Sequence, residues 1–556
     1  MKLVTHLSYW DKAGGAAVAA WRLHEGMQRF GVESRMVSRR RISQGPDVSS
    51  ISSDLFEAAD VFFQRRVRPT QPPGATLFSF SPTTIPLMEH PWIAAADVVH
   101  LHQVSDFISP EDIEQLCASG KTVFWTFHSQ WAYTGGCHYV GGVRRLPEDW
   151  QGTAQVAERL HPLVLMELER KKRIFSRSNI QVIAPCEWMA REAAASGVFA
   201  PENIHVVPYG IDLAVYSPAT AGMPAAQARE EKSPVSLLFG CQNLTERRKG
   251  YQELREALVL CMSDPIFAEA AREGQICLRT FGWKPVGEMD LPIPVTHVGV
   301  LDEESEVVGI FRSSSAFVCP TLDDNLPNVV MESLACGCPV VAFATGGVPD
   351  MVKHDQNGLL APQGDVPELA RLLKDFCLNE VLRTRLREGA AATDLTRWSL
   401  EAQASHILGL YDSVRPDLKS NDTRRMPAAP AELNLDGRIL PQFATEIAGA
   451  LVEERRFLKS SAAATAAAQN QKIRQAEDRI ARLKQESDAK TTKVAELLTE
   501  LRAIRAKLKQ ANQMKKQLKV KLIGSKEKIR TLKQHIAKNR PLFQRIWRFL
   551  RRSRKS

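Results

Sequence analysis

Two carboxylates, Asp324 and Glu332, stand eight positions apart in the most informative stretch of the sequence. A short apolar run at 316–318 leads into a polar loop, after which Pro327 is placed to begin a helix and Gly337 to end it. The pattern predicts one carboxylate in a loop at a helix N-terminus and the other in the first turns of that helix. Backbone N–H groups at such a terminus suit a diphosphate. The candidates for this contact are Asn325, Leu326, Asn328 and Val329.

A basic loop follows the apolar run at 237–239 and contains Arg248 and Lys249, with Asn243 near its start. A leaving nucleoside diphosphate gains negative charge as its bond to a sugar breaks. Cations directed at its phosphates therefore stabilise the transition state more than the ground state. Arginine would act as a fork and lysine as a point charge. The alternative is a solvated basic loop with no such role.

Two more clusters follow predicted strands in the N-terminal half. Gly14–Gly15 stands at a strand-to-helix turn, where glycine lets a phosphate or sugar approach the backbone, although such a pair is often only a tight turn. His128 follows the apolar run at 123–125 and is placed to bond a sugar hydroxyl, unless it is a capped, buried histidine. Trp131 offers an apolar face to a pyranose ring, and Thr134 is close behind.

Short apolar runs rich in β-branched residues alternate with longer helical patterns over about the first 410 residues. This alternation predicts parallel sheets covered by helices on both faces. The segment 217–233, rich in alanine, proline and charge, separates two such series. We therefore expect an α/β chain with two doubly wound, Rossmann-like domains and a ligand cleft between them.

The net charge of +10 has its origin in the C-terminal tail. Residues 451–556 hold 30 Lys and Arg against 9 Asp and Glu, a net charge of +21, which leaves −11 on the first 450 residues. Ten cysteines without paired spacing fit a reducing cytoplasm. No stretch approaches the roughly 20 apolar residues of a membrane span, so we expect a soluble or peripheral protein.

The tail has the pattern of a coiled coil. With Ile473 at position a, fifteen of the nineteen a and d positions between 473 and 536 are apolar, which predicts self-association. Pro541 ends the pattern, and 542–556 mixes aromatic and aliphatic residues with arginine. This segment suits an anionic membrane surface, the alternative being a solvated basic end.

The surroundings of the two carboxylates resemble the Glu-x7-Glu motif of the retaining family-four glycosyltransferases, which have the GT-B fold. The resemblance extends from Gly14–Gly15 through Pro-Tyr-Gly-Ile-Asp at 208–212 to about Trp398, and so covers about the first 410 residues. It implies metal-independent transfer of a hexose-type sugar from a nucleotide sugar, with no cofactor, in a reaction where the departing diphosphate helps to deprotonate the incoming hydroxyl.

The resemblance also implies a role for each matching residue. Glu332 would hold the ribose hydroxyls of the donor, and Asp324 would contact the transferred sugar. Lys249 would neutralise the diphosphate, and His128 would touch the donor sugar. Gly14–Gly15 would face the phosphates or the acceptor.

Two departures from the family pattern stand out. The first carboxylate is Asp324, one methylene shorter than the usual glutamate. Asn243 stands where a basic residue is common, so Arg247 or Arg248 would have to replace it beside Lys249.

The sequence thus divides into six predicted parts. They are an acceptor-side domain (1–215), a donor domain (216–396), a closing helix returning to the first domain (397–413), a linker (414–450), the coiled coil (451–540) and the basic tail (541–556).

The expected function is glycosyl transfer to a glycan or lipid-linked glycan in exopolysaccharide or lipopolysaccharide biosynthesis, in the cytoplasm and at the inner face of the plasma membrane. A nucleotide-sugar epimerase or phosphorylase of the same fold is an alternative. A second alternative is a non-catalytic coiled-coil scaffold that carries a degenerate domain. No nucleic-acid partner is expected, because the basic tail has no recognisable nucleic-acid-binding fold.

Overall fold

The computed structural model describes residues 2–52, 71, 75–80, 85–140, 161–218, 233–284, 291–301, 303–414 and 432–434. All of them belong to one compact unit, Met1–Gly437. The predicted coiled coil and basic tail, 451–556, lie outside the described residues, as does most of the predicted linker.

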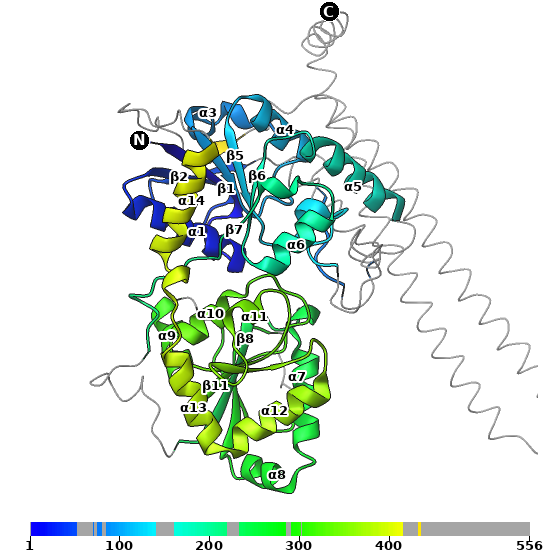
Figure 1. Cartoon of the computed structure of the whole chain (residues 1–556), viewed down its shortest axis with the longest axis vertical. Helices are drawn as coiled ribbons and strands as arrows, with labels where there is room; N and C mark the ends of the chain where they lie inside the picture. Colours follow the sequence, from blue (N-terminus) through cyan, green and yellow to red (C-terminus); the bar gives the residue numbers. More distant parts are fainter. Residues whose placement is uncertain are drawn as a thin grey trace, which may run out of the picture. The chain divides into compact units, whose positions relative to one another are not determined.

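The first sheet is parallel and has the strand order β14-β3-β2-β1-β4-β5-β6-β7 (Figure 1). Its central strand, β1, is buried from Leu3 to Ser8, which is typical of a parallel strand covered on both faces. The strands are β1 (Leu3–Trp10), β2 (Glu33–Arg40), β3 (Val48–Ser52), β4 (Val98–Leu101), β5 (Thr122–Thr126), β6 (Gln181–Ala184), β7 (Ile204–Val206) and β14 (Glu432–Asn434).

The second sheet is also parallel, with the order β10-β9-β8-β11-β12-β13. Leu237 and Val318 point into one apolar cluster, while their neighbours Leu238 and Phe317 point into another, as the two-residue period of a strand requires. The strands are β8 (Val235–Asn243), β9 (Ile276–Trp283), β10 (Val295–His297), β11 (Ala316–Cys319), β12 (Val340–Phe343) and β13 (Gly358–Ala361).

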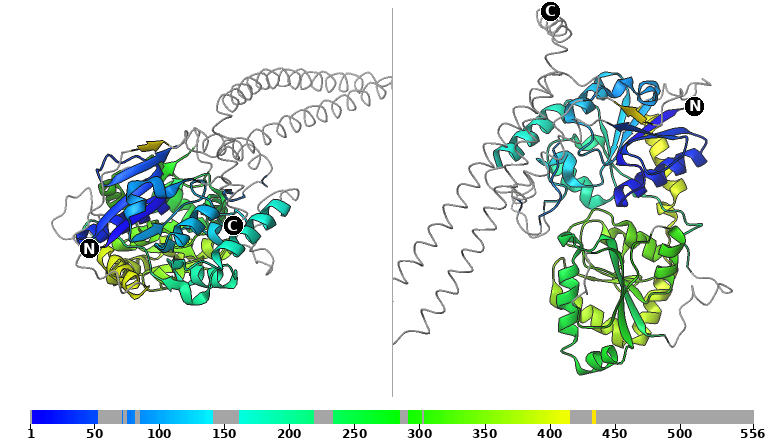
Figure 2. Two further views of the ribbon diagram at one scale, coloured as in Figure 1. Left: turned by 90° about the horizontal axis from the view of Figure 1, so that it is seen from above. Right: turned by 180° about the vertical axis from the view of Figure 1, so that it is seen from behind.

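Helices cover both faces of each sheet, as the two further views make clear (Figure 2). The α-helices of the first sheet are α1 (Gly15–Arg29), α3 (Pro91–Ala95), α4 (Pro110–Ala118), α5 (His161–Phe175), α6 (Glu187–Ala195) and α14 (Leu400–Val414). Those of the second are α7 (Tyr251–Cys261), α8 (Pro265–Arg272), α9 (Glu304–Arg312), α10 (Asn328–Ala335), α11 (Val348–Met351), α12 (Val366–Leu378) and α13 (Glu380–Ala391). Short 3₁₀ turns are η2 (Leu87–Glu89), η3 (Gln130–Tyr133), η7 (Pro201–Asn203), η9 (Arg247–Lys249) and η10 (Thr396–Trp398).

The last described helix, α14, packs against α1 on the first sheet (Figure 1). Ile407 and Tyr411 of α14 enter an apolar cluster with Val4 and Leu23. The Tyr411 hydroxyl also lies 2.6 Å from Nδ1 of His100 on β4. The first domain is therefore completed by a segment that follows the second domain in the chain.

The strand β14 lies within the segment 414–450, which the sequence indicates only as a linker. It pairs in parallel with β3, with Glu432 opposite Ser50 and Asn434 opposite Ser52. The segment predicted as a linker therefore contributes a short edge strand to the first sheet at these three residues. A three-residue edge strand between polar and proline-rich stretches has too few residues to show a two-residue period.

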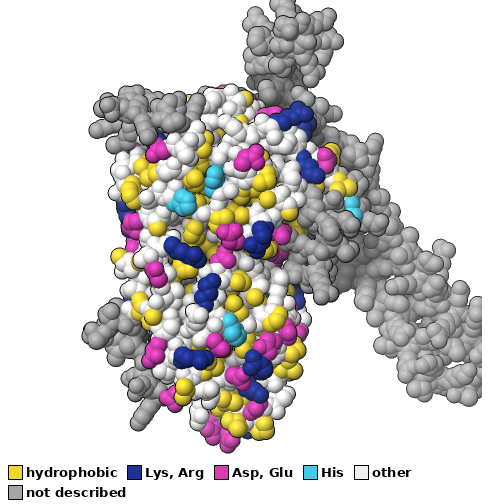
Figure 3. Space-filling model, viewed as in Figure 1, with side chains coloured by type: hydrophobic (Ala, Val, Ile, Leu, Met, Phe, Trp, Pro, Cys, Tyr) yellow, Lys and Arg dark blue, Asp and Glu magenta, His cyan; other side chains and the backbone are white. Residues whose placement is uncertain are grey.

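The prediction of two doubly wound parallel α/β domains is confirmed by these sheets. None of the described helices is long and apolar enough to cross a lipid bilayer. On the face that Figure 3 draws, acidic and basic side chains are interspersed. The described part of that face thus shows no field of one sign of the kind that nucleic-acid-binding domains use.

Candidate active site

The loop between β11 and α10 contains the first carboxylate, and α10 contains the second. Asp324 and Glu332 are 5% and 7% exposed. The loop packs on Gly346, whose φ is +54°, because a Cβ there would lie 1.8 Å from the carbonyl oxygen of Asp324. Gly346 thus holds the loop where a side chain could not fit.

Two cations of η9 meet the first carboxylate. Nζ of Lys249 donates to Oδ2 of Asp324 at 2.7 Å, and Nη1 of Arg248 lies 3.2 Å from the same oxygen. Burial alone would raise the pKa of the Asp324 carboxyl, but Lys249 and Arg248 outweigh burial and hold this pKa below its usual value. The carboxylate is therefore ionised and keeps both cations at the carboxyl edge of the second sheet.

The neighbouring basic residue, Arg247, pairs instead with Glu253 of α7. Of the two arginines that the sequence offers beside Lys249, the structure brings Arg248 to the carboxylate. Asn243 accepts hydrogen bonds from the backbone N–H and the hydroxyl of Thr245, and so shapes the turn before η9.

The second carboxylate has a partner that the sequence does not reveal. Nη2 of Arg22, on α1, donates to Oε1 of Glu332 at 2.9 Å and to the hydroxyl of Tyr216 at 3.2 Å. Burial opposes the charge on Arg22, but Glu332 outweighs it and raises the pKa of the guanidinium. Nothing in the local pattern around position 22 distinguishes this arginine from a surface residue, because its partner lies 310 positions away.

The glycine pair lies against the donor-side helix. Gly14 has a φ of +87° at the start of α1, and the carbonyl of Gly15 accepts a bond of 3.0 Å from Nδ2 of Asn328 at the start of α10. A Cβ at Gly14 would lie 2.9 Å from Oε1 of Gln242. Residues of both domains therefore meet here. In the same loop Leu326 is buried and Val329 is half-buried.

His128 follows β5 and is connected to the loop that contains Asn325 through the ring of Tyr209. Its ring stacks on Tyr209, with centroids 5.2 Å apart, and the Tyr209 hydroxyl accepts a bond of 2.9 Å from Nδ2 of Asn325. Burial lowers the pKa of His128 to about 3, so its ring is neutral at pH 7. Its Nε2 lies 3.1 Å from Nδ1 of His102.

Trp131 and Thr134 are placed differently from what the sequence suggests. They are 2% and 0% exposed. The indole N–H of Trp131 donates to the Ser79 carbonyl at 2.9 Å, and Nζ of Lys171 lies 3.8 Å from the ring centroid. The Thr134 hydroxyl donates to the Cys137 carbonyl. We therefore correct the acceptor-side role of both residues to packing, because neither presents a face to a sugar.

Four groups lie beside the predicted site that sequence reasoning did not identify. Arg22 and Tyr216 surround the second carboxylate, while Tyr209 and His102 flank His128. Each meets its partner across an interval of sequence, so local pattern gives no signal for Arg22, Tyr216 or Tyr209. For His102 the available signal is the histidines at 6 and 100 in otherwise apolar strands.

Two family profiles match the chain. Residues 13–215 match the family described as Glycosyltransferase Family 4, and residues 288–393 match Glycosyl transferases group 1. Together they span more than half of the 556 residues.

Curated relatives are distant and partial. The chain is 22% identical over 310 residues to the putative colanic acid biosynthesis glycosyl transferase WcaC of Escherichia coli, a match that covers 52% of this chain and 70% of the relative. It is 28% identical over 242 residues to D-inositol 3-phosphate glycosyltransferase of Xylanimonas cellulosilytica, covering 41% and 53%. It is 32% identical over 111 residues to D-inositol 3-phosphate glycosyltransferase of Corynebacterium jeikeium, a match that covers 20% of this chain and 26% of the relative. The chain thus spans between a quarter and seven tenths of these relatives.

Among solved structures, the Anabaena protein Alr3699/HepE in complex with UDP and glucose is similar, with a TM-score of 0.51 and 14% sequence identity. The match covers 74% of this chain and 100% of the Anabaena chain. At this identity the likeness shows the fold alone. The two profiles and the two parallel sheets with their joined loops place this chain in glycosyltransferase family four, with the GT-B fold.

Proposed function

We propose that this protein transfers a hexose-type sugar from a nucleotide-sugar donor to a glycan or lipid-linked glycan, with retention and without a metal ion. The observation that carries the proposal is the Asp324 carboxylate with Lys249 and Arg248 gathered on it. Two cations held in this way at a sheet edge are placed to neutralise a diphosphate, although Arg248 also pairs with Glu246 at 2.7 Å.

In this mechanism the two carboxylates bind the donor and neither acts as a nucleophile. Asp324 contacts the transferred sugar and orients Lys249 and Arg248, which stabilise the charge that develops on the departing diphosphate. A diphosphate oxygen takes the proton of the incoming hydroxyl on the same face of the sugar, so the anomeric configuration is kept. Glu332, held by Arg22, accepts hydrogen bonds from the ribose hydroxyls.

The proposed donor and pathway draw on two of the similar proteins. The Anabaena structure contains UDP and glucose, and the name of the Escherichia coli relative refers to colanic acid biosynthesis. The first supports a nucleotide-sugar donor and the second supports cell-surface polysaccharide biosynthesis, which we propose takes place in the cytoplasm.

A nucleotide-sugar panel tests the proposal. A donor that binds the folded state raises the melting temperature, and the labelled donor is then incubated with and without a lipid-linked glycan. We expect label in the glycan, turnover that requires the acceptor, an unchanged anomeric configuration by NMR and full activity in EDTA. Conversion of the sugar without an acceptor would support an epimerase and overturn the proposal. Loss of activity in EDTA, restored by Mg²⁺, would overturn the metal-free part.

A matched pair of substitutions connects the activity to the site. Glu332→Gln keeps an acceptor for Arg22 but weakens the ribose contact, whereas Glu269→Gln changes an exposed residue of α8. We expect weaker donor binding in the first variant alone. Equal donor affinity in both variants would contradict the role of Glu332.

For the tail we propose self-association through residues 451–540 and contact with an anionic membrane through 541–556, at the inner face of the plasma membrane. These proposals rest on the heptad pattern and on arginine interleaved with aromatic residues. Deleting 451–556 should reduce the oligomer to a monomer in sedimentation and keep the basal chemistry. Co-sedimentation of the full chain with vesicles should require anionic lipid, and indifference to lipid charge would refute the membrane contact.

A further inference from the structure

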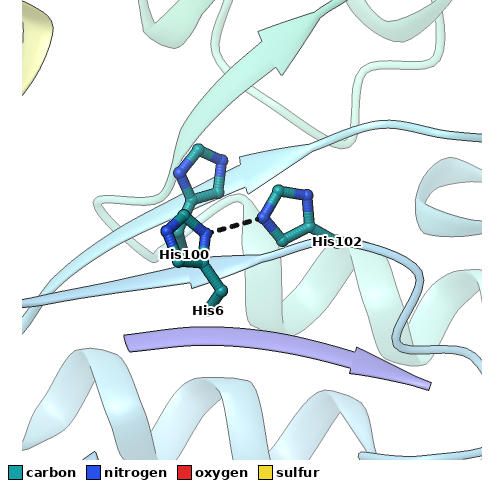
Figure 4. Close-up of side chains that lie close together, drawn as sticks. All are labelled: His6, His100 and His102. Atoms are coloured by element: carbon teal, nitrogen blue, oxygen red, sulfur yellow. Dashed lines mark hydrogen bonds between the residues drawn. The ribbon is translucent and has the colours of Figure 1, made fainter. Parts of the chain in front are cut away.

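Three histidines, His6, His100 and His102, lie close together inside the first domain (Figure 4). His6 of β1 is in register with His100 of β4, and His102 follows two positions later, so the three side chains share one face of the sheet. All three are at most 2% exposed. Buried histidines in contact must satisfy one another, because water does not reach them.

A chain of hydrogen bonds joins three of these rings. Nδ1 of His6 lies 2.9 Å from Nε2 of His102, and Nδ1 of His102 lies 3.1 Å from Nε2 of His128. Its two terminal nitrogens, Nε2 of His6 and Nδ1 of His128, are buried and have no partner among the described residues. The fourth ring, His100, lies outside the chain, since Tyr411 and Thr126 engage its nitrogens at 2.6 and 2.7 Å.

The rings of the chain are neutral. Burial lowers the pKa of His6, His102 and His128, and the neighbouring histidines lower the pKa of His6 and His102 further. Each neutral imidazole has one N–H and one lone pair. Only two proton arrangements therefore satisfy both hydrogen bonds. Either every ring is protonated on Nδ1 or every ring is protonated on Nε2.

The two arrangements differ at the ends of the chain. Each arrangement leaves one buried N–H without an acceptor, that of His6 when the rings are protonated on Nε2 and that of His128 when they are protonated on Nδ1. Only the second N–H is placed to find an acceptor on a ligand, because His128 stacks on Tyr209 beside Asn325 of the site loop. His6, by contrast, is 0% exposed within the sheet. The Nδ1 arrangement is therefore favoured, and it gives His128 a free N–H at its unpartnered nitrogen.

We propose that His6 and His102 are positioning residues that fix the tautomer of His128, so that its Nδ1–H donates to a hydroxyl oxygen of the bound sugar. The contact with a sugar rests on the proposed function, whereas the hydrogen bonds that join the three histidines do not. A donating Nδ1–H at His128 restricts the donor to sugars that carry an oxygen at the position facing His128, and excludes those with a hydrogen or a methyl group there.

A metal site fits the same rings less well. The rings of His100 and His102 are stacked, with centroids 4.6 Å apart and planes 11° apart, and those of His6 and His100 are 5.5 Å and 23° apart. Stacked rings direct their lone pairs side by side instead of toward one point. Both nitrogens of His100 also already have hydrogen-bond partners.

NMR of the full chain labelled with ¹⁵N-histidine tests the tautomer directly, because protonated and unprotonated ring nitrogens have separate shifts. The His128 signals are assigned by their loss in His128→Gln. We expect Nδ1 protonated and Nε2 unprotonated for His128, His102 and His6. An unprotonated Nδ1 of His128 would overturn the proposal, as would a change of these signals on adding EDTA, which would reveal a bound metal.

His102→Phe breaks the chain, and His90→Asn is its control, since His90 is equally buried but lies at the N-cap of α3. In His102→Phe we expect mixed tautomers of His128 and a kcat lowered roughly tenfold at similar KM, because a bond that strengthens in the transition state is lost. An unchanged tautomer in a folded His102→Phe would overturn the proposal. If the wild type turns over no nucleotide sugar, the proposed function fails. The tautomer of His128 measured by NMR still shows whether His6 and His102 fix its protonation.

Discussion

Two basic residues of one short turn, Arg247 and Lys249, have different partners. Lys249 meets Asp324 at the edge of the second sheet, whereas Arg247 pairs with Glu253 of α7. Their chemistry is similar and their positions are two residues apart, so they form a matched pair for testing phosphate neutralisation.

We expect Lys249→Gln to lower kcat/KM at least about a hundredfold, since one preorganised charge at a developing anion contributes about 3 kcal/mol to the transition state. Arg247→Gln retains a donor for Glu253 and should stay within about threefold of wild type. Initial rates with the donor from the nucleotide-sugar panel measure both, with thermal unfolding as a check of the fold. Equal losses in the two variants would refute the assignment.

Arg22 makes Glu332 important for stability as well as for ribose binding. Nε and Nη1 of Arg22 are buried and have no hydrogen-bond partner among the described residues. Removing the carboxylate therefore leaves a buried charge with the Tyr216 hydroxyl and with Oε1 of the exposed Glu304, 3.7 Å from Nη2. Glu332→Ala should therefore lower the free energy of unfolding by about 3 kcal/mol. Urea denaturation of Glu332→Ala and of the double variant Arg22→Met/Glu332→Ala checks this. The double variant should recover most of the loss, and additive losses would contradict the pairing.

Some site residues could be predicted from the sequence and others could not, for a physical reason. Asp324, Glu332 and Lys249 follow predicted strands or begin helices, so local pattern places them at the sheet edge. Arg22 and His102 sit within a helix face and behind a strand end, where only their distant partners give them a role. The burial of Trp131 was also beyond prediction, because an aromatic residue after a strand is equally compatible with packing and with a sugar.

At the scale of elements, the turn between η9 and α7 brings the two site loops together. Gly250 has a φ of +79°, and a Cβ there would lie 1.8 Å from the carbonyl oxygen of Pro320, in the loop that continues to Asp324. Only glycine lets these loops approach so closely. Gly274, after α8, has a similar φ of +74° but nothing within 4 Å of its Cβ position.

Gly250→Ala and Gly274→Ala separate backbone strain from steric clash. Gly274→Ala should lower the free energy of unfolding by about 1 kcal/mol, the cost of a left-handed residue with a Cβ. Gly250→Ala adds a clash with backbone and should cost at least about 3 kcal/mol, together with most of the activity. Chemical denaturation and rate measurements on both variants test this, and similar stabilities would show that the loops give way instead.

The strands were predictable from the sequence because both sheets are parallel and covered on both faces, so their strands read as apolar runs between helical patterns. The strand β14 was not, because its three residues make backbone pairs with β3 at the sheet edge without an apolar pattern of their own. Edge strands are specified by their neighbours more than by their composition.

At the scale of the whole molecule, buried neutral histidines make stability depend on pH. Burial lowers the pKa of His100, His128 and His138 to about 3 and that of His90 to about 4. The unfolded chain binds these protons near pH 6.5, whereas the folded chain does not bind them until pH 3–4. Stability is therefore full above pH 6.5 and is lost as the pH falls toward 3–4.

Each such histidine should remove about 2 kcal/mol from the free energy of unfolding between pH 7 and pH 5. Urea denaturation at both pH values measures the sum. His90→Asn keeps an N-cap for α3 but removes one titrating ring. The free energy of unfolding that this variant loses between pH 7 and pH 5 should therefore be smaller than the wild-type loss by about 2 kcal/mol. A stability that does not change with pH would mean that these rings take up protons at the same pH in the folded and the unfolded chain.

The return of α14 to α1 also sets the order in which the protein can fold. Val4 and Leu23 near the N-terminus pack against Ile407 and Tyr411. These two residues leave the ribosome only after the whole second sheet has been synthesised. A chain ending at residue 395 should accordingly have its first domain degraded by limited proteolysis while fragments covering 233–391 survive, and equal protection would contradict this order. During synthesis the domain that starts first is therefore the one that finishes last, and a nascent chain is exposed for longest at the half that emerges earliest.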